Sequence, residues 1–263
     1  MVSMKFGFCG VVALNLALGV IVATGAVGLV IEHEEETLNY QAPADDPGWA
    51  NVGVCDRWTA VYLGRGWVLT AAHVGASNII LEGTTYTADV KSQERVLNRD
   101  GTAADLMLFR IDPEPDLPSV KISDEPPPVG SLIVMVGSGL GRGEKTTGEG
   151  RVGFSWQAPS VKRWGTSLVH QRLHDQSVGN TDTFSTRFSI ARTAHEAHAA
   201  HGDSGGAAFA YLEDRWQLVG IILAVDHHIG QPERSAVYGN QTMIADLALY
   251  SQFIQGVTGI LSD

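Results

Sequence analysis

Cysteine is scarce in this sequence, which has two in 263 residues, Cys9 and Cys55. Cys9 lies in an apolar N-terminal segment, so Cys55 has no disulfide partner in the rest of the chain. This excludes a disulfide-stapled domain, and a chain of this length can fold by burying an apolar core alone. We expect Cys55 to be a buried, small apolar residue and not a reactive thiol.

Basic residues are also few, with 18 Lys and Arg against 29 Asp and Glu and a formal net charge of −11. Proteins that bind nucleic acid cluster Lys and Arg on one face, and no such face is evident, so nucleic acid is not an expected partner. The length and the hydrophobic fraction of 44% suit one large all-β unit or two small barrels that share a site.

An apolar run begins the chain, where Lys5 is the only charged residue before Glu32. A basic start, an apolar core and small residues around Ala26 predict a signal peptide over residues 1–26. The alternative is an uncleaved membrane anchor over residues 6–31, which is long enough to span a bilayer. Both readings export the rest of the chain, so we expect a secreted or periplasmic protein, with no membrane contact unless the segment stays uncleaved.

The most informative stretch is His201–Gly206, in which glycines flank a serine on both sides. Such a sequence favours a tight turn over a helix or strand interior. A serine hydroxyl is a weak nucleophile and needs a neighbouring base. The oxyanion formed by its attack needs fixed donors, which the N–H groups of Gly202 and Ser204 are placed to supply.

Two further motifs precede this stretch. Trp67–His73 is an apolar, β-prone run that ends in a histidine, and Asp105 heads another apolar run. The order His73, Asp105, Ser204 is one of the orders in which a catalytic triad is assembled.

The motifs T-A-A-H at 70–73, D-L-x-L-x-R at 105–110 and G-D-S-G-G at 202–206 together resemble those of the trypsin/chymotrypsin-like serine proteases. The resemblance covers roughly residues 48–256. It departs from the family in having Val74 where many members have a cysteine.

The resemblance implies an all-β fold of two six-stranded antiparallel β-barrels with a C-terminal α-helix. It implies His73 as general base, Asp105 as its orienting carboxylate and Ser204 as nucleophile, with Gly202 and Ser204 forming the oxyanion hole. It implies no metal and no organic cofactor. The expected protein is a secreted serine endopeptidase that acts on polypeptides as a monomer.

The expected organisation is a signal peptide, an N-terminal arm over residues 27–47 and a protease domain over 48–263. Within that domain, barrel 1 takes about 48–112, a proline-rich linker takes 113–128, and barrel 2 with the closing helix takes 129–263. Turn-bounded apolar runs predict strands at 59–63, 67–71, 78–81, 84–90, 106–111, 131–137 and 216–225, a last strand beginning at 236, and a helix from 242.

The partner of Asp203 is left open by the sequence. In the family, a freed N-terminal Ile or Val amine commonly pairs with the aspartate before the serine. The segment Val30–His33 lies in about the right place but departs from the usual Ile-Val-Gly-Gly start. A buried, unpaired carboxylate is costly, so we expect some partner.

The resemblance also predicts a substrate pocket. Six residues before the serine, His198 falls at the pocket base, and Leu223–Val225 replaces the usual Ser-Trp-Gly segment. The residues assigned to the pocket are His198, Ala199, His201, Val225 and Ala236, the last at the position of a wall glycine. Side chains larger than glycine favour small neutral residues before the cut bond. In a rival reading, His198 or His201 favours Glu.

Other readings remain. One is an inactive homologue that binds partners through a protease-like surface. Another is an esterase on a different fold, which expects the order Ser, Asp, His. The residues His195, His198 and His201 would bind zinc if helical. The glycine-rich run at 137–143 does not have the dinucleotide spacing G-x-G-x-x-G, and we expect a turn there.

Overall fold

The computed structural model describes residues 28–33 and 39–260, with only the backbone at 174–177. The predicted signal peptide, and all of the alternative anchor except its last four residues, lie outside the described residues. No helix within the described part of the chain is long and apolar enough to cross a membrane.

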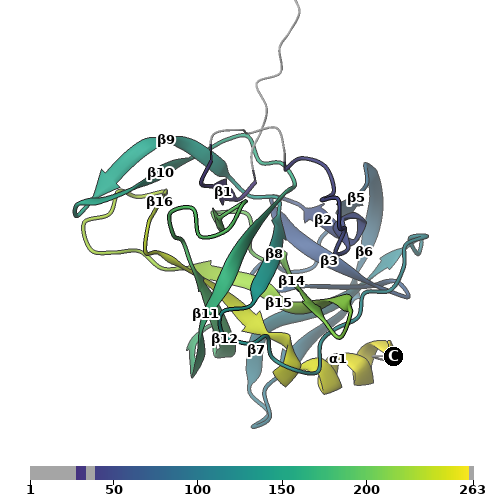
Figure 1. The fold of residues 1–263 in the computed structure, drawn as a ribbon. Coiled ribbons are helices and arrows are strands. Elements are labelled where there is room, and N and C mark those ends of the chain that lie inside the picture. The colour runs from purple at the N-terminus through teal and green to yellow at the C-terminus, as the bar shows by residue number, and fades with distance from the viewer. Residues whose placement is uncertain (1–27, 34–38, 261–263) are drawn as a thin grey trace, which may run out of the picture.

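The first barrel is closed by six antiparallel strands in the order β2-β3-β4-β7-β6-β5 (Figure 1). Its strands are β2 (Val52–Cys55), β3 (Trp58–Gly64), β4 (Trp67–Ala71), β5 (Ile79–Leu81), β6 (Thr84–Leu97) and β7 (Ala103–Asp112). All five predicted strands of this region are present, β6 being longer than expected. Cys55 is fully buried and free, as predicted, and burial raises the pKa of its thiol to about 11.

The second barrel is closed in the order β11-β12-β17-β15-β14-β8. Its strands are β8 (Leu132–Gly137), β11 (Arg163–Val178), β12 (Thr181–Arg187), β14 (Ala207–Leu212), β15 (Arg215–Val225) and β17 (Gln241–Asp246). The predicted fold class, two six-stranded antiparallel barrels, is confirmed.

The helix is shorter than the sequence predicts. A helix from residue 242 was expected, but residues 242–246 belong to β17, which pairs with both β12 and β15. Closing the barrel therefore takes precedence over the helical spacing of the apolar residues. A 3₁₀ turn over Leu247–Leu249 follows, and the helix α1 spans Ser251–Thr258. A further 3₁₀ turn, Trp49–Asn51, precedes β2.

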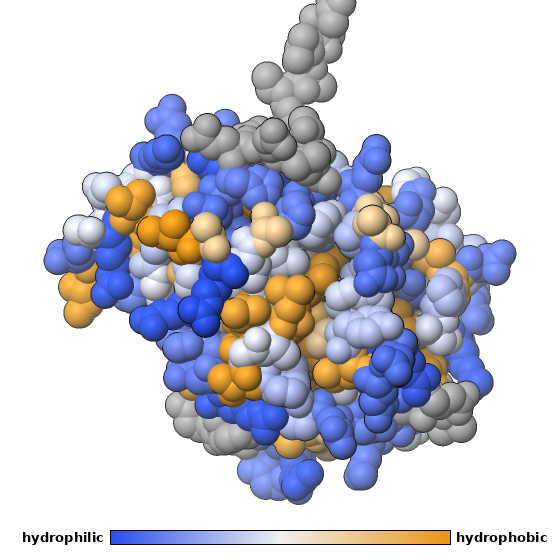
Figure 2. Space-filling model, in the orientation of Figure 1, coloured by the Kyte–Doolittle hydropathy of each residue, from blue (hydrophilic) through white to orange (hydrophobic). Residues whose placement is uncertain are grey.

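Two small sheets lie outside the barrels. The strands β9 (Gly141–Gly148), β10 (Arg151–Gln157) and β16 (Ser235–Val237) form one sheet that projects from the molecule (Figure 1). Figure 2 shows apolar side chains on the surface in this region, where Val152 is half exposed. The strand expected at 236 thus exists, but it belongs to this sheet and not to the barrel.

The other small sheet ties the N-terminal arm to barrel 2. In it, β1 (Val30–Ile31) pairs with β13 (Ala197–His198), and both residues of β1 are buried. The last residues of the alternative anchor therefore belong to the folded unit.

The barrels meet through a shared apolar core and a few polar contacts. One buried cluster includes Leu69 and Leu106 from barrel 1 together with Leu223 from barrel 2. The Tyr250 hydroxyl donates to Asn98 Oδ1 at 2.8 Å, which fixes the start of α1 against barrel 1. Strand ends from both barrels are thereby held at a common rim.

Candidate active site

His73 and Asp105 lie at this rim and are held together by two hydrogen bonds. His73 Nδ1 is 2.7 Å from Asp105 Oδ2, and the His73 backbone N–H donates to Asp105 Oδ1 at 2.9 Å. An ionised carboxylate only accepts, so Nδ1 carries the proton and Nε2 is left as the acceptor of the neutral ring. The pair thus sets the imidazole tautomer that a general base requires.

Barrel 2 helps to hold this aspartate. The Asp105 backbone N–H donates to Thr181 Oγ1 at 2.7 Å. At Gly179, where φ is +55°, a Cβ would lie 2.6 Å from Asp105 Cβ. The tip between β11 and β12 therefore covers Asp105 closely and leaves its side chain only 14% exposed.

The serine lies on a turn that glycine makes possible. Gly202 and Gly205 have φ of +102° and +84°, and a Cβ at Gly205 would lie 1.9 Å from Thr59 O. The turn is closed by the Gly206 N–H, which donates to Asp203 O at 2.8 Å. Within the described chain, no hydrogen bond occupies the N–H groups of Gly202 or Ser204. These two donors remain available for an anion.

Contacts with β3 of barrel 1 hold the serine turn on the side of barrel 1 where His73 lies. The Thr59 N–H donates to Ser204 O at 3.1 Å, and the Trp58 ring contacts both the His73 and the His201 rings, with centroids 5.9 and 4.6 Å away. Ser204 Oγ makes a long hydrogen bond, 3.4 Å, to Leu223 O. In the described chain no hydrogen bond joins Ser204 Oγ to His73 Nε2, and in free enzymes such catalytic hydrogen bonds often form only when substrate binds.

Asp203 finds its partners in the backbone. Its fully buried carboxylate accepts the N–H groups of Gly139 and Ala200, each at 2.8 Å. The backbone N–H of Leu29 also faces this carboxylate and acts to lower its pKa. Burial nonetheless raises the pKa of Asp203 to about 7, with the Arg163 guanidinium opposing the shift. The partners of Asp203 are thus backbone amides, chiefly those of Gly139 and Ala200, with the amide of Leu29 in the N-terminal arm adding to them.

The arm is fixed on both sides of Leu29. A Cβ at Gly28 would lie 2.1 Å from Val161 O, so only glycine passes this point. Beyond β1, the Glu32 N–H donates to Glu196 O at 2.8 Å and Arg142 Nη1 donates to Glu32 O at 3.0 Å. The amide that reaches Asp203 is therefore held in place by contacts before and after it.

A cavity of about 160 Å³ opens beside Ser204. It is lined by Trp58, Trp156, Ala199, Ala200, His201, Ser204, Ile222, Ala224 and Val225. Three residues assigned to the pocket, Ala199, His201 and Val225, line this cavity.

The other two assigned residues, His198 and Ala236, do not line it. His198 is buried against Phe188, with ring centroids 5.7 Å apart, and burial lowers its pKa to about 4. Ala236 lies in β16, opposite Phe154 of the projecting sheet. Ala236 is therefore held in the projecting sheet and His198 in the buried interior, so neither reaches the cavity lining. Ala199, which does line the cavity, is held from β17 by Thr242, whose Oγ1 accepts the Ala199 N–H at 3.1 Å.

Sequence reasoning missed the two tryptophans of the cavity. Trp156 reaches it from β10, in a hairpin whose length and course no motif indicates. Trp58 begins β3, the strand whose Thr59 holds the serine turn. An aromatic residue one position before the predicted strand at 59–63 was the available signal, and it is a weak one.

The three histidines of the zinc reading have separate surroundings. His195 lies 3.2 Å from His33 Nε2, His198 packs against Phe188 and His201 against Trp58. The described residues contain no group of three or more His, Cys, Asp or Glu side chains placed to hold a metal ion.

Comparison with known proteins agrees with the fold. A mutant of human heparin binding protein (CAP37) has a similar fold, with 16% identity, a TM-score of 0.55 and coverage of 84% of this chain and 96% of that one. The Rv3671c protein of M. tuberculosis, in the inactive form of a mutant, also has a similar fold. Its identity is 14% and its TM-score is 0.51, and the match covers 84% of this chain and 97% of that one. No curated protein sequence matches significantly. The trypsin-like peptidase domain matches residues 58–221, more than half of the chain, which therefore belongs to the trypsin-like peptidase family.

Proposed function

We propose that this protein is a serine endopeptidase in which Ser204, His73 and Asp105 act as a catalytic triad. The observation that carries the proposal is the doubly bonded His73–Asp105 pair at the same rim as a serine turn with two unoccupied amides. A hydroxyl, a base with a fixed tautomer and a pair of fixed donors are the parts that acyl transfer requires.

In the proposed reaction, His73 Nε2 takes the proton of Ser204 Oγ as that oxygen attacks the peptide carbonyl. The Gly202 and Ser204 N–H groups hold the oxyanion, and each such donor lowers the barrier by about 3 kcal/mol. The imidazolium then protonates the leaving amine, which departs and leaves an ester on Ser204. Water, deprotonated by His73, attacks this ester and releases the acid and free Ser204. Asp105 stays ionised throughout.

A fluorophosphonate probe tests this proposal, because it labels only a serine activated by its base. We expect stoichiometric labelling and peptide hydrolysis by the wild type, and neither by Ser204→Ala or His73→Ala. Ser77→Ala, in the loop between β4 and β5 but outside the site, should label like the wild type. Absence of labelling in a folded wild type would favour the inactive, partner-binding homologue.

The cavity supports a preference for small neutral side chains before the cut bond. Its volume is about 160 Å³, and the side chains of Ala199, Ala224 and Val225 line it. His201 lines it, and this keeps the rival preference for Glu open for test. In a panel of peptides differing at that position, we expect Ala and Val to be cleaved fastest and Arg slowest. Val225→Gly should extend the preference to larger residues, whereas dominant cleavage after Glu would establish the rival.

We further propose that the protein is exported through its N-terminal segment and acts on polypeptides as a monomer. The support is the sequence pattern of residues 1–26. N-terminal sequencing of the exported protein tests this. A mature start near Val27 is expected, and a start at Met1 in the membrane fraction would establish the anchor.

A further inference from the structure

A second cavity lies on barrel 2 and shares no lining residue with the cavity beside Ser204. Its volume is about 340 Å³, which is within the range of small-molecule sites. It is formed by the start of β8, the middle of β11 and the segment after β12. It is lined by Val129, Gly130, Leu168, Val169, His170, Arg187, Ser189 and Arg192.

The charged and titratable groups among these lining residues are cationic or become so. Arg187 ends β12, Arg192 lies in the following loop, and His170 stands on β11. His170 sits at a register shift between Val169 and Gln171, an irregularity that re-aims a strand side chain. Within the described residues no carboxylate lines the cavity, and neither guanidinium forms an ion pair there.

The positive charges of Arg187 and Arg192 disfavour protonation of His170. The pKa of His170 is lowered first by burial and then by the charges of Arg187 and Arg192. Glu196 is an acid whose pKa the charge of Arg192 lowers, and its side chain is buried. The oxygens of Glu196 already accept from Thr193, Ser189 and Ser167, so they are not available to the cavity. The chain therefore leaves an excess of positive charge here.

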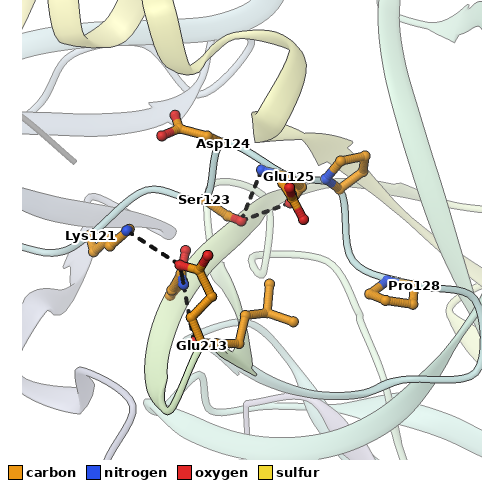
Figure 3. A pocket seen from close by; sticks show the side chains of 9 residues that line it. Lys121, Ser123, Asp124, Glu125, Pro128 and Glu213 are labelled. Carbon is orange, nitrogen blue, oxygen red and sulfur yellow. Dashed lines mark hydrogen bonds and ion pairs between the residues drawn. The ribbon is translucent and has the colours of Figure 1, made fainter. Parts of the chain in front are cut away.

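A third cavity, which contains a lysine, offers a comparison of the charges that surround a cation (Figure 3). There, Lys121 Nζ lies 3.8 Å from Glu213 Oε2, and Asp124 and Glu125 line the same hollow. In that cavity carboxylates face the lysine, whereas no carboxylate lines the cavity on barrel 2. On a protein with a net charge of −11, two arginines and a histidine around one hollow call for an anion from outside.

We propose that this cavity binds a phosphate group, carried by a small organic phosphate or by a phospholipid headgroup. Guanidinium groups bind phosphate oxygens through paired N–H donors, and two of them match a doubly charged anion better than a carboxylate. Val129, Leu168 and Val169 provide an apolar wall for the organic part. Ile190, which is 68% exposed, lies in the segment between Arg187 and Arg192.

Calorimetric titration with inorganic phosphate at constant ionic strength tests the proposal. We expect saturable binding by the wild type that is at least tenfold weaker in Arg187→Gln/Arg192→Gln. The double variant Arg99→Gln/Arg215→Gln removes the same charge at exposed sites elsewhere and should bind like the wild type. Equal loss in both double variants, or no saturable binding by the wild type, would overturn the proposal.

The histidine provides a readout that loss of structure cannot imitate. Phosphate should raise the pKa of His170, measured from its ring proton by NMR, because the anion offsets the two arginines. A His170 pKa that phosphate leaves unchanged would overturn the proposal. Glycerol 3-phosphate in solution and phosphatidylglycerol vesicles, with phosphatidylcholine as blank, then separate the two sources. Arginine-dependent binding of one probe, and not the other, identifies the source.

Discussion

The two barrels differ in the kinds of polar residue that they bury beneath the site. In barrel 1, the buried polar residues of the described chain are neutral ones such as Asn51, Thr59 and Thr70. Barrel 2 and its flanking loops bury the ionisable residues Arg163, Glu196, His198, Asp203 and Asp246. Barrel 1 thus presents the His73–Asp105 pair on a neutral support, whereas barrel 2 presents Ser204 on one that titrates. The comparison teaches that pH should act on the serine turn through the interior of barrel 2.

The largest expected effect tests the contribution of barrel 1. Asp105→Asn keeps an oxygen for the His73 backbone N–H but reverses the tautomer preference of the ring. We expect kcat to fall by about 10⁴-fold with little change in the free energy of unfolding. Steady-state kinetics and urea unfolding measure the two quantities. Asp100→Asn, on the same barrel, should retain full activity, and a loss in Asp105→Asn below tenfold would contradict the triad.

The next effect tests the glycine turn of barrel 2. An alanine at Gly205 would meet Thr59 O and Thr70 Oγ1, at 1.9 and 2.2 Å from its Cβ, in a conformation with φ of +84°. We expect Gly205→Ala to lose about 3 kcal/mol of stability and activity beyond about 100-fold. Gly75 has φ of +78° and open space around it, so Gly75→Ala should cost about 1 kcal/mol. Similar losses in both would show that backbone strain alone decides.

A smaller effect is expected at the carboxylate behind the serine. Asp203→Asn replaces one acceptor oxygen by an NH₂ group that faces backbone N–H donors. We expect kcat/KM to fall about 10- to 100-fold, since a lost hydrogen bond to a charged group is worth about 1.5–3 kcal/mol. Asp182→Asn serves as the control of the same chemistry. Full activity in Asp203→Asn would mean that the turn holds without the amides of Gly139, Ala200 and Leu29.

The smallest effect is a pH dependence of stability. Burial raises the pKa of Glu196 from 4.5 to about 7. The folded state therefore binds this proton more tightly than the unfolded state, and the stability that it contributes is lost as pH rises from about 4.5 to about 7. Relative to Glu196→Gln, the wild type should lose about 1–3 kcal/mol across this range, as urea unfolding would show. Glu94→Gln, exposed on barrel 1, keeps Glu196 and should therefore lose the same stability across this range as the wild type.

Sequence alone predicted the parts that depend on short motifs and period-two alternation. The run Trp67–Ala71 is both the predicted strand and β4, and His73 follows it as expected. The motif at Asp105 likewise begins inside a real strand, β7. These elements are local, since their apolar faces and glycine turns are written in consecutive residues.

The remainder depends on pairings between distant segments. The helical spacing after Thr242 was misleading because β12 and β15 both recruit β17. Ala236 was misplaced because a count from the V-Y pair cannot see a separate sheet. The contact of Leu29 with Asp203 joins segments that no spacing relates, so only the folded chain shows it.

The use of an amide at Leu29 has a consequence for timing. A terminal ammonium exists only after a bond has been cut, whereas a peptide N–H is present from the moment of synthesis. Removal of any stretch upstream of Gly28 leaves that N–H chemically unchanged. The Leu29 N–H near Asp203 is therefore the same before and after removal of a leader. A switch from latent to competent enzyme would have to lie elsewhere than in this contact.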